Sequence, residues 1–164
     1  MAAIDPAGTS MSQYKPGHQA LRQGRASIPN QIYLVTSTTR NRKPLFTDWL
    51  SARIACPCFE RAQLLKDATM LAWVLMLDHA HWLVQLGTQL ELSELVLRVK
   101  SAAAREINQW RNVRDPVWDR GFHDRALRRD EDIQAAARYI AANPLRAGLV
   151  ERVGDYPFWN AVWL

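Results

Sequence analysis

The stretch LAWVLMLDHAHWLVQL, from Leu71 to Leu86, constrains the fold more than any other part of the sequence. It is an apolar run that is interrupted by Asp78 and then by two histidines separated by a single residue. Such a run, broken by a turn at its middle, predicts a buried strand followed by a tight hairpin. Because successive side chains of a strand point to opposite faces, His79 and His81 would share one face and Ala80 would point to the other. We therefore expect the histidines on a central strand.

Two imidazoles on one face of a strand can hold a metal ion. The alternative is that one histidine packs inside the protein while the other is solvated. A polar pair at the mouth of so apolar a hairpin is costly to bury without partners, which favours a shared ligand or a hydrogen-bond acceptor. The spacing alone names no reaction.

The composition is that of a single domain with a sizeable core, since the chain has 164 residues, of which 48% are hydrophobic and 23% charged. A net charge of +5 and a pI near 9.6 favour a polyanionic partner, with nucleic acid as the leading candidate, although the charge could serve solubility alone. Cys56 and Cys58 have no second cysteine pair, so we expect no structural zinc on them. The sequence shows neither an apolar stretch of about 20 residues nor a secretion pattern, which predicts a soluble, cytoplasmic protein.

The first 23 residues mix Pro, Gly, Ser, Ala and Gln without apolar periodicity. They predict a flexible N-terminal arm, which leaves residues 24–164 as one domain. Arg25 stands at the junction, in a phrase that could lie along a phosphate backbone. An ordinary solvated lead-in explains the same composition.

A first strand is predicted at Gln31–Thr38, which is rich in Tyr, Val, Ile and Thr. Arg40, Arg42 and Lys43 follow it and concentrate positive charge at the strand end. These side chains could neutralise phosphates, or they could form a merely solvated turn.

Two helical segments are expected around the histidine hairpin. Asp48–Asp67 has helical character, with Thr47 or Asp48 as its cap, but Pro57 lacks the backbone donor that a helix needs, and we expect a break there. Apolar residues at three- and four-residue spacing predict an amphipathic helix from about Glu94 to Arg111, with Ser93 as its N-cap. Lys100 falls off the apolar stripe of this helix, which indicates a solvated face or a DNA contact.

The remaining elements lie in the last third of the chain. Pro116–Leu127 mixes aromatic and charged residues and predicts a short strand or an extended loop. Within it, His123 could be a third metal ligand, but nothing in its spacing requires that, and a surface or hydrogen-bonding role is favoured. Asp130 is expected to cap a last helix, from Glu131 to about Ala142.

Tyr139 and Asn143 are four residues apart near the end of that helix, so their side chains can lie on the same side. A tyrosine oxygen can attack a phosphodiester, and an asparagine oxygen can join two imidazoles around a cation. The alternative is that Tyr139 belongs to the core and that Asn143, which precedes Pro144, is a turn or cap residue.

Taken together, these phrases resemble the HUH single-strand DNA transposases with one catalytic tyrosine, and within them the REP-associated tyrosine transposases. The resemblance covers about Gly24 to Trp159. Its strongest parts are MLDHAHWLV at Met76–Val84 and ARYIAANPLRAGLV at Ala137–Val150. The phrases GRASIP, YLVTSTTRNRKPLF, VWDRGFHDRALRRDED and DYPFW support it. Several ordered phrases are far more specific than a histidine pair alone.

The resemblance implies an α+β fold with a ferredoxin-like antiparallel sheet, helices mainly on one face and the active site on the other. It assigns His79 and His81 as HUH histidines, Asn143 as the residue that completes the metal site and Tyr139 as the nucleophile. The implied cofactor is a divalent metal, Mg²⁺ or Mn²⁺. The chain departs from the family at Pro57, where relatives generally carry a longer first helix. Ala80 is also smaller than the usual residue between the histidines.

The implied activity is cleavage and rejoining of single-stranded hairpin DNA of the repetitive extragenic palindrome (REP) type through a 5′-phosphotyrosine. The implied setting is a bacterial cytoplasm, with the protein on the nucleoid when bound to DNA and a monomer as the simpler expectation. Trp82 and Trp118 could stack unpaired bases or pack in the core. The expected DNA contacts are Arg25, Arg40, Arg42, Lys43, Arg125 and Arg128.

Two other functions remain open from the sequence. One is a non-catalytic nucleic-acid-binding module, for RNA or DNA, because a ferredoxin-like sheet often has that role and a fold does not establish activity. The other is a water-using metal-dependent phosphoesterase, for which His79, His81 and a carboxylate such as Asp78 could suffice.

Overall fold

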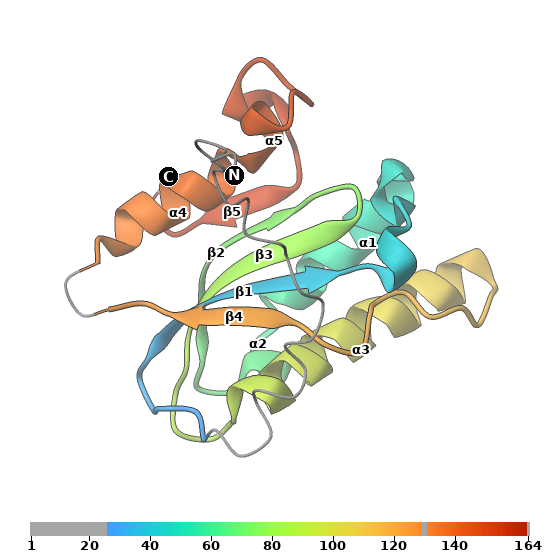
Figure 1. Cartoon of the computed structure of the whole chain (residues 1–164). Helices are drawn as coiled ribbons and strands as arrows, with labels where there is room; N and C mark the ends of the chain where they lie inside the picture. Colours follow the sequence, from blue (N-terminus) through green and yellow to red (C-terminus); the bar gives the residue numbers. More distant parts are fainter. Residues whose placement is uncertain (1–25, 129–130, 164) are drawn as a thin grey trace, which may run out of the picture.

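The computed structural model describes residues 26–128 and 131–163, so the predictions for the N-terminal arm and for Arg25 fall outside the described residues. Its centre is a five-stranded sheet in the order β4-β1-β3-β2-β5, in which every neighbouring pair is antiparallel (Figure 1). The first four strands have the ferredoxin-like order, and β5 extends the sheet beside β2. The predicted fold class is confirmed. The strands are β1 (Ile32–Thr38), β2 (Thr69–Leu75), β3 (His79–Gln85), β4 (His123–Ala126) and β5 (Trp159–Ala161).

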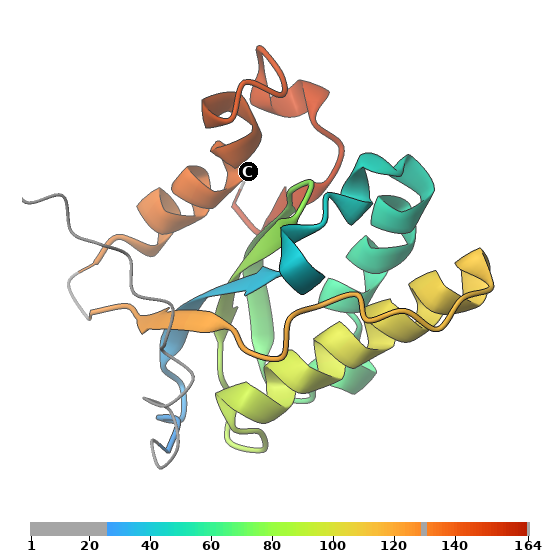
Figure 2. The same cartoon turned by 45° about the vertical axis from the view of Figure 1, so that its right-hand side comes forward.

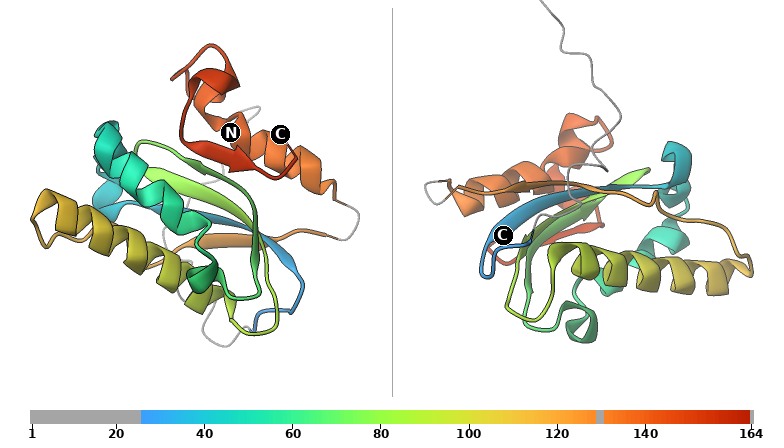
Figure 3. Two further views of the ribbon diagram at one scale, coloured as in Figure 1. Left: turned by 180° about the vertical axis from the view of Figure 1, so that it is seen from behind. Right: turned by 60° about the horizontal axis from the view of Figure 1, so that its bottom comes forward.

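The helices cover the two faces of the sheet unequally, as Figures 2 and 3 show. On one face lie α1 (Trp49–Phe59), α2 (Ala62–Leu65) and the long α3 (Leu92–Arg111). On the other face α4 (Ile133–Ala141) packs across β2, β3 and β5 and leads into the short α5 (Asn143–Arg146). Short 3-10 turns lie at Arg40–Arg42, Leu45–Thr47 and Val153–Asp155. In the described ranges no helix is long and apolar enough to span a membrane.

The central hairpin forms as its sequence predicts. β2 pairs with β3 so that Leu75 faces Ala80, and the amide of Met76 donates to the carbonyl of His79 at 2.7 Å. Trp82 points to the face that α1 covers, where its ring packs edge-on against Phe59 with centroids 5.2 Å apart. Residues of alternating parity on β3, including both histidines, therefore face the side that carries α4.

The predicted break at Pro57 is wrong, because α1 continues through this residue and ends at Phe59. Pro57 lies in the last turn, where only one helical hydrogen bond is lost, and the neighbouring Cys58 and Phe59 are fully buried. The other end of α1 agrees with the sequence. The Asp48 carboxylate caps it by accepting from the amides of Leu50 and Ser51, both at 3.3 Å.

The caps predicted for the other two helices are wrong. Helix α3 begins at Leu92, before Ser93, and the amide of Leu92 donates to the hydroxyl oxygen of Ser27 at 2.9 Å. Helix α4 begins at Ile133, and its N-cap is Asp132, which accepts from Ala135 at 3.1 Å, in place of the predicted Asp130. In the first case the capping group comes from a distant part of the chain, so the local sequence could not reveal it.

The prediction that Lys100 lies on a solvated or DNA-binding face is also wrong. Its side chain is buried under the segment that leads into β4, with only 7% of the residue exposed. The ammonium group donates to the carbonyls of Asp119, at 2.5 Å, and Gly121, at 2.9 Å. Burial lowers the pKa of Lys100 from 10.5 to about 8, although the charge of Asp119 opposes this shift. This lysine ties α3 to the connecting segment and is not on a solvated or DNA-binding face.

Candidate active site

The two histidines stand side by side on β3 and face the side of the sheet that α4 occupies. Their ring centroids are 4.9 Å apart, with the ring planes at 80° to each other. His79 lies opposite Thr38 and His81 opposite Thr36 on the neighbouring strand. The predicted shared face is therefore confirmed, with Ala80 fully buried on the opposite face.

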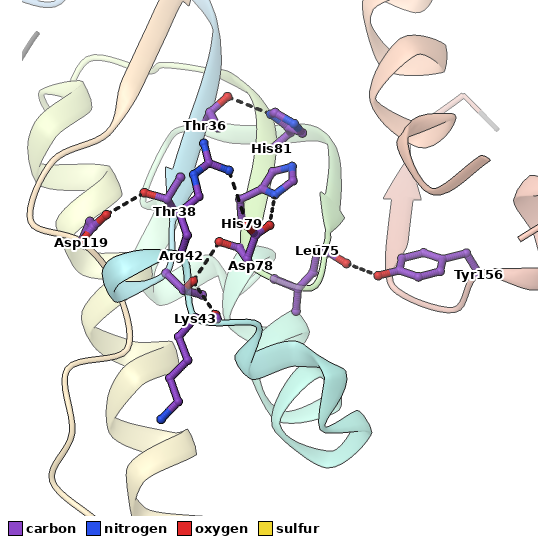
Figure 4. A network of polar contacts seen from close by, with 11 residues as sticks. Thr36, Thr38, Arg42, Lys43, Leu75, Asp78, His79, His81, Asp119 and Tyr156 are labelled. Atoms are coloured by element: carbon purple, nitrogen blue, oxygen red, sulfur yellow. Dashed lines mark hydrogen bonds and ion pairs between the residues drawn. The ribbon is translucent and has the colours of Figure 1, made fainter. Parts of the chain in front are cut away.

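One nitrogen of each imidazole is held by a neighbouring oxygen (Figure 4). His79 Nδ1 lies 2.6 Å from Asp78 Oδ1, and since a carboxylate can only accept, the proton is on Nδ1. His81 Nδ1 lies 2.8 Å from the hydroxyl oxygen of Thr36, an equivalent arrangement in the tautomer that donates from Nδ1. In His79 the nitrogen with a lone pair for a metal ion is thus Nε2, and in His81 it is Nε2 in the tautomer that donates to Thr36. Oxygen partners on the distal ring nitrogen are typical of metal-binding histidines.

Asp78 is shared between His79 and Arg42. Its second oxygen lies 3.5 Å from Arg42 Nη1, and its backbone carbonyl accepts from both the amide and the hydroxyl of Thr39, at 2.8 and 2.9 Å. Burial alone would raise the pKa of the Asp78 carboxyl, but the hydrogen bond from His79 and the charges of His79 and Arg42 hold it below its usual value. The carboxylate is therefore ionised and fixes the orientation of the His79 ring.

His81 is neutral at physiological pH. Burial, together with nearby positive charges, lowers its pKa from 6.5 to about 4. These charges come from His79, Arg146 and Arg42. Neutral imidazole is the form that binds metal ions, so this environment suits His81 for that role.

Tyr139 and Asn143 lie at the end of α4, on the same side of the sheet as the histidines. Tyr139 is 60% exposed, which excludes the core role that the sequence left open. The Asn143 amide nitrogen donates to the carbonyl of Ile140 at 3.0 Å, so this residue does act as a helix cap. Within residues 26–128 and 131–163, no hydrogen bond joins Tyr139 or Asn143 to either histidine. The described fold places the four predicted residues on one face without direct contact between the two pairs.

The sequence did not identify Arg146 as part of this site. It follows Tyr139 by seven residues, and its guanidinium carbon lies 3.8 Å from the centroid of the Tyr139 ring. Its charge also lowers the pKa of His81, as noted above. The local signal was the phrase NPLRAGLV after the tyrosine, which carries a cation one helical turn beyond Asn143. The partners Thr36 and Asp78 could be identified only once the strand register was known.

His123 was considered as a third ligand. It lies opposite Thr36 on β4, as His81 does on β3, so all three share one cross-strand row. However, the described part of the chain contains no cluster of three or more His, Cys, Asp or Glu side chains that could hold a metal ion. The hypothesis of a third histidine ligand is not supported, and a further ligand would have to be of another type, such as an amide oxygen.

Three of the predicted DNA-contacting cations, Arg40, Arg42 and Arg125, are held in ion pairs but remain accessible. Arg40 lies 3.9 Å from Asp119, and the side chains of Arg40 and Arg42 are 49% and 59% exposed. Arg125 Nη1 binds both oxygens of Glu131, at 2.6 and 2.9 Å, and the backbone amide of Arg128 donates to the same carboxylate. Exposed pairs of this kind are weak, so phosphate can compete for these arginines. Lys43, in the loop that follows β1, is also exposed.

The two tryptophans considered for base stacking are core residues. Trp82 and Trp118 are 1% and 7% exposed. Their rings pack against each other with centroids 6.3 Å apart, and Phe46 packs on Trp118 at 5.4 Å. Neither indole can therefore stack on an unpaired base in this structure.

The sheet order, the histidine pair and the tyrosine on an overlying helix define a transposase-type α+β domain. A sequence model described as "Transposase IS200 like" matches residues 27–143, and the chain belongs to this family. The match spans the histidine pair and ends at Asn143. The resemblance found in the sequence is thus confirmed at the level of the family. A comparison with curated proteins found no match.

Two solved structures share the fold. One is a REP-associated tyrosine transposase bound to a REP hairpin, with a TM-score of 0.62 and 24% identity over 91% of this chain and 82% of that chain. The other is a protein of Deinococcus radiodurans R1 assigned as a transposase, with a TM-score of 0.51 and 18% identity over 73% of this chain and 95% of that chain. At these identities the likeness is one of fold.

Proposed function

We propose that this protein is a metal-dependent single-stranded DNA endonuclease and transposase that cleaves and rejoins REP-type hairpin DNA through a 5′-phosphotyrosine intermediate. The observation that carries the proposal is the placement of an exposed Tyr139 on the helix that covers the face of His79 and His81, while both imidazoles are oriented by an oxygen partner at Nδ1. Family membership supports the same reaction class.

The residues present fit a divalent cation, Mg²⁺ or Mn²⁺. His79 and His81 would bind it through Nε2. Asn143 would contribute its side-chain oxygen, because its bond to Ile140 uses only the amide nitrogen. When bound, the cation offsets the charge that builds on the scissile phosphate. Asp78 keeps the proton of His79 on Nδ1 and so keeps Nε2 in the ligand form.

In the reaction, Tyr139 attacks the phosphorus through its phenolic oxygen. A Tyr139–phosphate bond forms, the bond from phosphorus to the 3′ oxygen breaks, and the phenolic proton lost is matched by one gained at the 3′ hydroxyl. One phosphodiester replaces another, so the step can be reversed to rejoin a strand. The cations Arg40, Arg42 and Lys43, at the end of β1, lie beside the histidine hairpin and would track the phosphates of the strand.

The water-using phosphoesterase is less well supported, because the carboxylate it needs is already committed. Asp78 bonds to His79 and pairs with Arg42, and it acts as the partner of a ligand in this structure. Among the described residues there is also no group of three or more His, Cys, Asp or Glu side chains that could hold a metal ion.

The decisive experiment replaces Tyr139 with phenylalanine and incubates the protein with hairpin DNA and Mg²⁺ or Mn²⁺. Tyr139→Phe removes one exposed hydroxyl, so we expect normal folding and hairpin binding but neither strand cleavage nor a denaturation-resistant adduct. The control is Tyr33→Phe, a buried position on β1 whose hydroxyl accepts from the amide of Ile28, and this variant should still cut. Cleavage by Tyr139→Phe, or a wild-type adduct located on Tyr33 or Tyr156, would refute the proposal.

A further inference from the structure

Arg146 makes two contacts with Tyr139 from the next helix. Its guanidinium carbon lies 3.8 Å from the centroid of the tyrosine ring, the distance of a stacked cation–π pair. Its Nη2 also donates to the backbone carbonyl of Tyr139 at 2.8 Å. That carbonyl is one of the last in α4, and the side-chain amide of Asn143 also donates to it, at 3.5 Å. The same side chain therefore caps the helix and covers one face of the ring.

These contacts are the ones that restrict an otherwise exposed ring. Tyr139 is 60% exposed, and its neighbours Arg138 and Ala142 on the helix leave it facing solvent. An exposed aromatic side chain changes rotamer on the picosecond-to-nanosecond scale unless something holds it. The planar guanidinium, itself tied to the backbone, provides that restraint.

The charge of Arg146 also acts on His81. Its positive charge contributes to the lowered pKa of His81, together with burial and the charges of His79 and Arg42. One side chain thus stacks on the tyrosine and lies within electrostatic reach of the histidines. It connects the two halves of the site, which share no hydrogen bond among the described residues.

We propose that Arg146 is a positioning residue that holds the Tyr139 ring in the orientation from which its oxygen attacks the scissile phosphate. This inference rests on the proposed function. An attacking group that is free to turn spends most of its time out of line, and misplacement by about 1 Å can cost about 100-fold in rate. Arg146 is the restraint that reduces this loss, and it acts through the ring without bonding to the phenolic oxygen.

The test compares Arg146→Met and Arg146→Lys with the wild type under single-turnover conditions, at saturating hairpin DNA and Mn²⁺. Arg146→Met should slow adduct formation about 10- to 100-fold while hairpin affinity changes less than about 3-fold. Arg146→Lys keeps the charge but cannot stack a planar group and donate in a fork, so it should remain slow. The matched control is Arg138→Ala, which removes an exposed arginine of α4 that pairs with Asp132 at 3.5 Å, and it should react at the wild-type rate.

A second readout does not depend on activity. In protein labelled with 3-fluorotyrosine, the ¹⁹F resonance of Tyr139, assigned with Tyr139→Phe, should shift and narrow in both Arg146 variants and stay unchanged in Arg138→Ala. Wild-type rates in Arg146→Met, or full rescue by Arg146→Lys, would overturn the positioning role while leaving the proposed function intact. If the wild type forms no adduct at all, the proposed function fails, and the role assigned to Arg146 fails with it.

Discussion

Protonation of His81 should weaken folding in the acid range when no metal ion is present. The folded protein holds this imidazole partly buried, beside three positive charges, and its pKa falls from 6.5 to about 4. Between these two values the unfolded chain binds a proton that the folded protein does not. The free energy of unfolding therefore decreases as the pH falls from about 6.5, and the loss is complete below about 4.

The size of the effect follows from the shift. A pKa difference of one unit corresponds to about 1.4 kcal/mol, so the change from 6.5 to about 4 predicts a complete loss of about 3 to 4 kcal/mol. A loss of that size is a substantial fraction of the stability of a small domain, which is about 5 to 15 kcal/mol. It should be visible as a lower urea midpoint at unchanged slope.

The measurement is urea unfolding of wild type and His81→Gln at several pH values from 7 to 4, with a chelator present. Carboxyl groups titrate in the same range, so the informative quantity is the difference between the two proteins. Relative to the variant, the wild type should lose about 3 kcal/mol between pH 7 and pH 4. Parallel curves for wild type and His81→Gln would refute the reasoning.

Two further predictions concern groups that the site and the core hold in place. Asp78→Ala removes the carboxylate behind His79 and should weaken Mn²⁺ binding about 10- to 100-fold in a calorimetric titration. The control, Asp119→Ala, removes the partner of Arg40 and should leave Mn²⁺ binding unchanged. Equal Mn²⁺ affinities of the two variants would contradict the role of Asp78. Lys100 has a folded pKa of about 8 against 10.5 in the unfolded chain, so wild type should gain about 3 kcal/mol over Lys100→Met as the pH rises between these values. A difference in unfolding free energy that does not vary with pH would show that the lysine is not desolvated.

The hairpin was predictable because its signal is local. Alternating side-chain direction on a strand places His79 and His81 together whatever else the chain does. The apolar flanks on both sides then require a central position in the sheet. The same holds for the Asp48 cap, where the side chain and the amides it accepts from are neighbours in sequence.

The errors arise where distant residues determine the structure. Helix α3 begins at Leu92 because Ser27 caps it from 65 positions away, whereas Ser93 had the right chemistry only locally. Lys100 looks solvent-facing by helical periodicity, but the segment that leads into β4 covers it and supplies two carbonyl partners. Pro57 is tolerated because packing of the last turn outweighs one lost hydrogen bond.

The candidate site shows the same division. The residue types and their spacing indicated His79, His81, Tyr139 and Asn143, and family resemblance gave them roles. The side chains that orient them depend on strand register and on the fold of the chain after α4. Thr36 faces His81 only because β1 pairs with β3 in one register, and Arg146 reaches Tyr139 only because α5 turns back at Asn143.

The sharing of Asp78 between Arg42 and His79 gives the site a thermodynamic property of its own. A phosphate that binds the Arg42 guanidinium would break its ion pair with Asp78. The Asp78 carboxylate would then bond more strongly to the proton on His79 Nδ1, which would make Nε2 a stronger electron-pair donor. By thermodynamic linkage, if bound DNA raises the metal affinity through this carboxylate, bound metal raises the DNA affinity by the same factor. Strand and ion would then load cooperatively through one aspartate that touches neither of them.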